Sequence, residues 1–150
     1  MIRMNVLRNC PVICHARRVG LLQHITLNQS QKTVRALIVS GGLKGKRVVI
    51  PENVLAVTSE FILVKQTEPY DRSIEIDPYA FVRDTTGSLI GKVSDYLLDE
   101  QELKVLAAEL TEGYFHAGRG ARKWLYTYAP SEQWTGEIIV PSDISCEPKG

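Results

Sequence analysis

A gapless internal repeat restricts the fold of this sequence more than any other feature. Residues 18–39 align with residues 89–110 when the chain is shifted by 71 positions. Aliphatic or aromatic residues fall at 22, 25 and 27 in the first copy and at 93, 96 and 98 in the second. The identical pairs are Gly20/Gly91, Leu27/Leu98, Val34/Val105 and Ala36/Ala107. We therefore expect two halves with the same chain path.

The repeated spacing predicts strands with an irregular step. A period of two indicates a β-strand, and a single step of three within it is typical of a β-bulge. Polar segments follow at 28–32 and 99–103, and each precedes a new apolar run, at 33–40 and 104–111. Apolar runs that flank a short polar segment predict a β-hairpin in each copy.

A second motif, an aliphatic triplet followed by proline, occurs as "VVIPENV" at 48–54 and "IIVPSDI" at 138–144. Proline cannot donate a ladder hydrogen bond, so Pro51 and Pro141 are expected at a strand end or sheet edge. If the motifs are equivalent, the second copy contains about 19 extra residues, which we assign to a long hairpin at about 113–136, and it lacks the last strand of the first copy. The turn-forming stretch at 67–79 separates an expected domain 1–70 from a domain 71–150.

Charge is divided unevenly along the chain. Nine Lys and Arg residues and no Asp or Glu precede Glu52, whereas the rest of the chain has nine Lys and Arg against seventeen Asp and Glu. A basic half attracts anionic partners such as RNA or lipid headgroups. The alternative is that the two halves attract each other, within one chain or between chains.

The combination of motifs resembles the PRC-barrel family. "LIGKVSDYLLD" with "IIVPSDI" is similar to the small β-barrel of the photosynthetic reaction-centre H subunit and of the ribosome-maturation protein RimM, and "RVGLLQHITLN" with "VVIPENV" is a weaker second copy. The resemblance covers about 17–64 and 79–144. It implies an all-β fold of two tandem PRC-like barrels, marked by Gly20, Pro51, Gly91 and Pro141, and a docking module without catalytic residues.

Basic residues are the candidate contacts for such a module. In "HAGRGARKW" at 116–124, glycines and cations lie next to aromatic residues, as in proteins that hold single-stranded nucleic acid. A basic tip on a long hairpin explains the same stretch and is favoured. The predicted anion or RNA contacts are Arg17, Arg18, Lys44, Lys46, Arg47, Arg119, Arg122 and Lys123.

Cys10, Cys14 and His15 raise the question of a metal site, which His24 or Cys146 could complete. Structural zinc sites usually have a second close pair of ligands, and the sequence lacks one. The equivalent positions in the second copy are Phe81, Thr85 and Thr86. Ordinary reduced cysteines are therefore favoured, and no metal or cofactor is predicted.

Together these patterns predict a non-enzymatic binding or adaptor protein that engages a protein or ribonucleoprotein partner. With no secretory leader and no run of about 20 apolar residues, a cytoplasmic location is expected. The first alternative is association with an anionic membrane or a membrane complex, and the last is a small-molecule or metal-binding enzyme. An unpaired strand edge would favour homo-oligomers.

Overall fold

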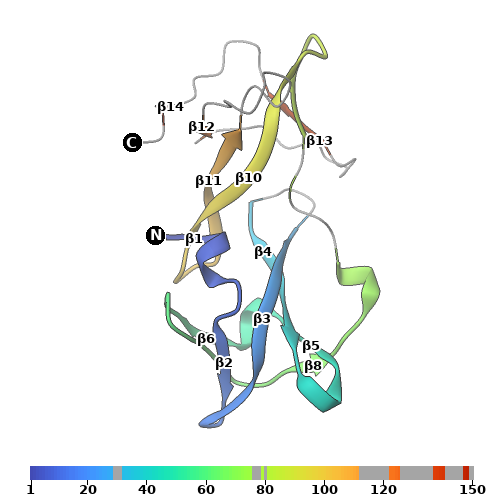
Figure 1. Ribbon diagram of the computed structural model, residues 1–150, viewed down its shortest axis with the longest axis vertical. Coiled ribbons are helices and arrows are strands. Elements are labelled where there is room, and N and C mark those ends of the chain that lie inside the picture. The colour runs from blue at the N-terminus through green and yellow to red at the C-terminus, as the bar shows by residue number, and fades with distance from the viewer. Residues whose placement is uncertain are drawn as a thin grey trace.

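The computed structural model describes residues 1–28, 32–75, 79, 81–111, 122–125, 137–140 and 147–148, the last three ranges by their backbone alone (Figure 1). The described residues form strands connected by turns and short 3₁₀ helices, and the fold is all-β and barrel-like, as predicted. The 3₁₀ helices are η1 (Met4–Leu7), η2 (Gly42–Lys44), η3 (Pro51–Asn53) and η4 (Arg72–Ile74).

The described strands form two sheets. The first has the strand order β6 (Val54–Val57), β7 (Ile62–Val64), β2 (Pro11–Cys14), β3 (Arg17–Leu27), β4 (Val34–Ser40), β5 (Lys46–Val49) and β8 (Glu68–Pro69). The second has the order β13 (Glu137–Val140), β9 (Phe81–Asp84), β10 (Leu89–Asp99), β11 (Lys104–Thr111), β12 (Arg122–Leu125) and β14 (Glu147–Pro148), and β1 (Ile2–Arg3) pairs with β10.

The two sheets share one topology. β7 pairs parallel with β2, and β13 pairs parallel with β9, while the neighbouring strands that continue each sheet through β3 and β10 are antiparallel. Position by position, β7-β2-β3-β4-β5-β8 corresponds to β13-β9-β10-β11-β12-β14. The expected internal duplication is thus present in the strand order, and β6 is the additional strand of the first sheet.

The proline motifs do not occupy corresponding places, contrary to the expected alignment. β5, before Pro51, lies next to β4, whereas β13, before Pro141, lies next to β9 and corresponds to β7. Both strands are short aliphatic runs, and such a run does not specify its neighbour. The extra residues of the second half therefore fall elsewhere: ten residues, 112–121, separate β11 from β12, where five, 41–45, separate β4 from β5. The second half also has β13 and β14 after β12, so it does not lack the strands that end the first.

Both long strands contain the predicted bulges. The pairing of β3 with β4 skips one residue between Leu22 and His24, and that of β10 with β11 skips one between Val93 and Asp95, 71 positions later. A second pair of irregularities lies just before Gly20 and Gly91, on the side that faces β2 and β9. The bulges explain how Leu22, Ile25 and Leu27 are all buried despite the step of three.

Gly20 is required by the close approach of two strands. A Cβ atom at this position would lie 2.0 Å from the backbone oxygen of Ser40, far inside van der Waals contact. Since the register pairs Leu21 with Ser40, a side chain on Gly20 would push β4 away from β3. In the first half, the glycine that marks the repeat is therefore required for a steric reason.

The core is continuous between the halves, which differs from the expectation of two barrels with separate cores. One cluster contains buried residues of the first sheet, such as Leu22 and Ile62, and of the second, such as Tyr96 and Leu110. Met4 and Leu7 from η1 belong to the same cluster. Each curved sheet therefore buries apolar side chains against the other half, and the two halves stabilise each other.

Where the two sheets meet, equivalent residues of the repeat make reciprocal contacts, as they would around a local two-fold axis. Thr33 forms an isolated antiparallel bridge with Lys104, its own equivalent in the repeat. The N–H of Val34 donates to the oxygen of Leu103 at 3.0 Å, and the N–H of Val105, the equivalent of Val34, donates to the oxygen of Lys32 at 2.7 Å. Reciprocal bonds of this kind are the signature of a self-complementary dimer interface, here within one chain.

Two segments, which we call the first arm (residues 2–8) and the second arm (residues 70–75), border the junction of the two sheets (Figure 1). The first arm begins the chain but pairs with the second sheet, where Ile2 and Arg3 face Leu98 and Leu97. The second arm precedes β9 but packs on the first sheet, with Tyr70 and Ile74 against a small buried cluster on β4 and β5. Each arm thus contacts the half that it does not lead into. The division at residue 70 remains a prediction, although residues 2 and 3 lie in the second sheet.

Candidate functional site

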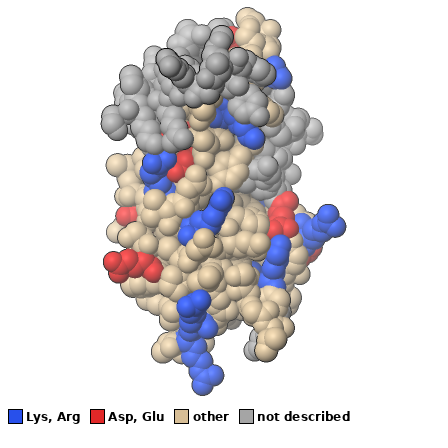
Figure 2. All heavy atoms as spheres, in the orientation of Figure 1, with Lys and Arg blue, Asp and Glu red and all other residues tan. Residues whose placement is uncertain are grey.

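Two of the predicted contact residues, Arg17 and Arg18, lie at the end of the first sheet. They begin β3 after a turn in which His15 and Ala16 have positive φ values of 51° and 62°. Both arginine side chains are exposed, and in the described part of the chain neither has a carboxylate within ion-pair distance. Figure 2 shows Lys or Arg atoms at the lowest point of this face, and the Asp and Glu atoms of the face lie above them.

A loop of glycines and cations lies at the same end. Because Leu21 pairs with Ser40, residues 41–45 lie beside the start of β3. Leu43 is fully exposed in this loop, and the positive φ values of Gly42 and Gly45 produce the turn around it. Lys44 follows in η2, and its side chain is not among the described atoms. The end of the first sheet thus combines cations with one exposed aliphatic side chain.

Lys46 and Arg47 are held by contacts within the protein. Arg47 donates from Nε to the hydroxyl of Thr67 at 3.0 Å and from Nη2 to its backbone oxygen at 3.1 Å. Lys46 donates to Glu75 at 3.4 Å, and its Nζ lies 5.1 Å from the centre of the Tyr70 ring. These two cations attach the second arm and the segment before it to β5, so they are less available to a partner than Arg17 and Arg18.

Glu75 is the centre of a polar cluster on the second arm. It accepts a bond from Nε2 of His24 at 2.9 Å and another from the hydroxyl of Tyr70. The Tyr70 bond is the main cause that lowers the pKa of Glu75, and the same bond raises the pKa of Tyr70. Burial lowers the pKa of His24, with help from Lys46 and Arg8, and these effects outweigh the attraction to Glu75.

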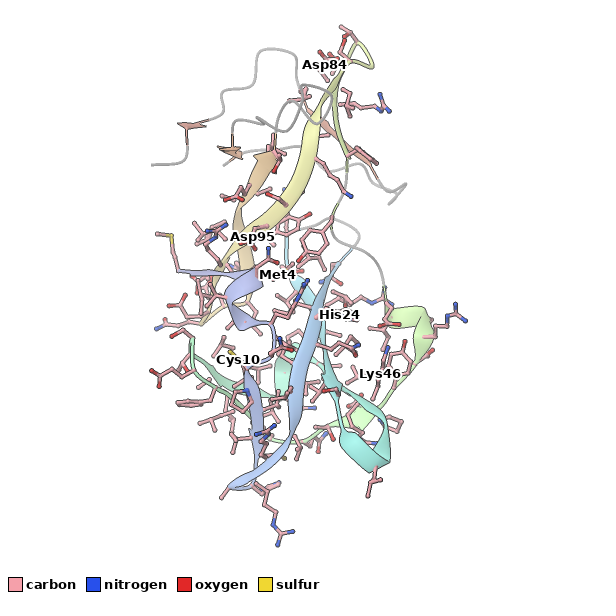
Figure 3. All side chains as sticks on the ribbon, in the orientation of Figure 1. Met4, Cys10, His24, Lys46, Asp84 and Asp95 are labelled. Carbon is pink, nitrogen blue, oxygen red and sulfur yellow. The ribbon has the colours of Figure 1, made fainter. Side chains whose placement is uncertain are left out.

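A second ionic cluster anchors the first arm (Figure 3). Arg3 donates from Nε to Asp95 and from Nη2 to Glu109, both at 2.9 Å. The two carboxylates are 1% exposed, whereas the Arg3 side chain is 36% exposed. Asp95 also accepts from the backbone N–H of Asn5 and of its neighbour Tyr96. One partly exposed arginine therefore pairs with two buried carboxylates.

The contacts of the two arms correspond to each other. Asp95 is the repeat equivalent of His24, so Arg3–Asp95 and Glu75–His24 are contacts at equivalent positions of β10 and β3. The charges are reversed between them, since the first arm supplies a cation and the second an anion. The sequence analysis did not find these pairs, because the partners are 92 and 51 positions apart.

The cysteines have the surroundings of ordinary thiols. Cys10 is buried and donates to the backbone oxygen of Ser59 at 3.3 Å, and burial raises the pKa of its thiol. Cys14 donates to the backbone oxygen of Lys65 at 3.3 Å. Within the described ranges, no three His, Cys, Asp or Glu side chains are grouped as metal ligands would be. Cys146 lies outside these ranges.

The remaining predicted residues are only partly described. Gly91 is buried in β10, and Pro51 begins η3. Arg122 and Lys123 lie in β12, which pairs with β11, and the structure describes them by their backbone alone. Arg119 and Pro141 lie outside the described residues, as does most of the region expected as a long hairpin.

No family model and no curated protein matches the chain. The resemblance to PRC-barrels therefore depends on the motifs alone. Of the helices in the parts of the chain that the structure describes, none has the length and apolar character needed to cross a membrane.

Proposed function

We propose that the protein is a non-enzymatic binding protein, built from PRC-like units, that docks on a ribonucleoprotein through the cationic end of its first sheet. The observation that supports this proposal best is the pair Arg17 and Arg18, which are adjacent, exposed and without a carboxylate partner among the described residues. Cations that no internal carboxylate neutralises are available to phosphate groups.

The test is a tagged pull-down at low and at moderate salt, with RNA and protein identified in the eluate. We expect RNA or ribosomal components that are lost as salt rises, because binding to phosphates releases counterions. The double variant Arg17→Gln, Arg18→Gln should retain less RNA. In a titration with single-stranded RNA, its slope of log K against log salt should be smaller by about 1.4, at roughly 0.7 per lost phosphate contact.

A control variant, Arg72→Gln with Lys104→Gln, also removes two exposed cations, but from the second arm and from β11. It should bind RNA like the unchanged protein. Equal losses of RNA binding in both double variants would show that binding depends on net charge alone. Recovery of a protein partner that resists salt, without RNA, would show that the partner is a protein and not a ribonucleoprotein.

The exposed Leu43 favours a second candidate function, association with an anionic membrane surface. An aliphatic side chain between cations fits the boundary between headgroups and acyl chains. Sedimentation with vesicles that contain phosphatidylserine, and not with neutral ones, would support this function. Leu43→Ser should then weaken sedimentation, whereas indifference to both kinds of vesicle would exclude it.

A further inference from the structure

An open cavity of about 470 Å³ lies where the first arm meets the second sheet. Asn5 and Arg8 line it from the first arm, Lys92 and Ser94 from β10, Thr111 from β11, and Tyr79 from the segment after the second arm. This volume is within the range of pockets that bind small molecules. In Figure 3, Met4 and Asp95 mark the place where the arm crosses toward the second sheet.

The short helix η1 directs one side toward the core and another toward the cavity. A 3₁₀ helix has three residues per turn, so residues three apart lie on the same side. Met4 and Leu7 are buried in the shared core, and Asn5 and Arg8, one position later in each case, line the cavity. The anchoring of Arg3 on Asp95 therefore also places Arg8 at the cavity.

The lining is cationic. Arg8 and Lys92 contribute two positive charges, and among the described residues of the lining none is acidic. The ammonium group of Lys92 lies 5.4 Å from the centre of the Phe81 ring, a contact that positions the group without neutralising it. Lys92 is also paired with Thr111 across β10 and β11, so that hydroxyl lies beside it.

The hydrogen bonds of the lining show which groups can still donate to a ligand. The hydroxyl of Tyr79 donates to Asn5 at 2.6 Å, Asn5 donates to the backbone oxygen of Ser94 at 3.0 Å, and the Ser94 hydroxyl donates to Glu109 at 2.9 Å. These protons are already used. The side chains of Arg8, Lys92 and Thr111 donate to no acceptor in the described part of the chain. The available side-chain donors are thus the two cations, the Thr111 hydroxyl and the second amide N–H of Asn5, which suit an anionic group.

We propose that this cavity binds a small organic anion, a phosphate- or carboxylate-bearing molecule, with its charged group between Arg8 and Lys92. The ring of Tyr79 provides apolar surface for the body of the molecule. This site is separate from the cationic end of the first sheet, and its ligand is a small molecule rather than a nucleic acid.

The probe is phenyl phosphate, titrated into the full ¹⁵N-labelled chain at low ionic strength, with phenol as its neutral match and inorganic phosphate as the anion without a ring. We expect saturable shifts in the amide signals of Arg8, Lys92 and Thr111. Phenyl phosphate should bind more tightly than inorganic phosphate, and phenol should bind most weakly. Arg8→Gln and Lys92→Gln should each weaken binding of phenyl phosphate about tenfold, because each removes a charge-assisted contact.

Arg72→Gln is the matched control, since it removes an exposed arginine that does not line the cavity, and it should leave the affinity unchanged. The amide spectra also show directly that each variant is folded. Equal affinity for phenol and phenyl phosphate, unchanged affinity in both cavity variants, or shifts that surround Arg17 and Arg18 instead would each overturn the proposal. The double variant Arg17→Gln, Arg18→Gln tests the retention of RNA. The proposed RNA contact and the proposed anion site can therefore fail independently of each other.

Discussion

Replacing Arg3 with methionine should destabilise the protein strongly. Arg3→Met keeps a long apolar side chain but removes the cation that binds Asp95 and Glu109, both 1% exposed. Breaking a buried ion pair from one side leaves an uncompensated charge and costs about 3–5 kcal/mol. Because the Arg3 side chain is 36% exposed, water weakens its contacts, and we expect the lower end of this range, about 3 kcal/mol.

The measurement is urea denaturation of Arg3→Met and of the unchanged protein, supported by thermal unfolding. A loss of about 3 kcal/mol corresponds to a fall in Tm of roughly 6–12 °C for a chain of this size. As a control, Arg72→Met removes an exposed arginine from η4 and should change the free energy of unfolding by less than about 0.5 kcal/mol.

A triple variant separates lost neutralisation from lost packing. Adding Asp95→Asn and Glu109→Gln to Arg3→Met removes the buried charges, and an amide oxygen at position 95 can still accept from the N–H groups of Asn5 and Tyr96. It should recover at least half of the lost stability. A loss below about 1 kcal/mol for Arg3→Met, the size of a surface ion pair, would refute the argument that this cluster anchors the first arm.

Three further predictions concern single residues of β3. Gly20→Ala should destabilise the protein by about 1–3 kcal/mol in urea denaturation, because its Cβ would collide with Ser40, and Gln23→Ala, an exposed change in the same strand, should be nearly neutral. Thr26→Val should raise stability by about 1 kcal/mol, since the Thr26 hydroxyl is buried without a hydrogen-bond partner in the described structure; a loss of stability would reveal a partner. Burial holds the pKa of His24 below its ordinary value. At a pH between the folded and the unfolded pKa, the unfolded chain therefore binds more protons than the folded protein. His24 thus contributes stability that is complete above about pH 6.5 and is lost as the pH falls through its folded pKa. His24→Gln should therefore reduce the loss of stability on acidification in this range, and an unchanged pH profile would contradict this.

The features that sequence analysis predicted are those encoded locally. The apolar residues at 22, 25 and 27, and at 93, 96 and 98, include one step of three. Side chains of a regular strand alternate between its two faces, so a step of three keeps both residues buried only if a bulge inserts one extra residue. The hairpins follow from polar segments between apolar runs in the same way. The proline motifs misled because a run such as "IIVP" predicts a short strand and contains no information about its neighbour. β13 pairs with β9 rather than with β11, the equivalent of the strand β4 that pairs with β5.

The arms and the cavity required the structure. Arg3 and Asp95 are separated by 92 positions, and no periodicity relates an N-terminal arginine to an aspartate in a distant strand. Arg8 and Lys92 were counted as cations of their halves, but their shared cavity follows from the crossing of the first arm. An exposed "RR" pair is readable from sequence, since a turn before a strand places Arg17 and Arg18 at its end.

The reversed charges of the two arm contacts favour the observed attachment of each arm to its sheet. If the first arm lay on β3, Arg3 would meet His24, which already has Lys46 close to it, and would find no carboxylate at that position. If the second arm lay on β10, Glu75 would meet the buried carboxylate of Asp95 and be repelled. Unfavourable contacts in the wrong arrangement distinguish partners as effectively as favourable contacts in the right one. Two identical halves could not make this distinction, because each arm would fit both strands equally. The cavity depends on the same asymmetry, since Asn5 and Arg8 come from the first arm and Tyr79 from the chain after the second. The divergence of the two copies thus accounts for a cationic cavity beside the first arm, in a molecule whose strand order is nearly symmetric.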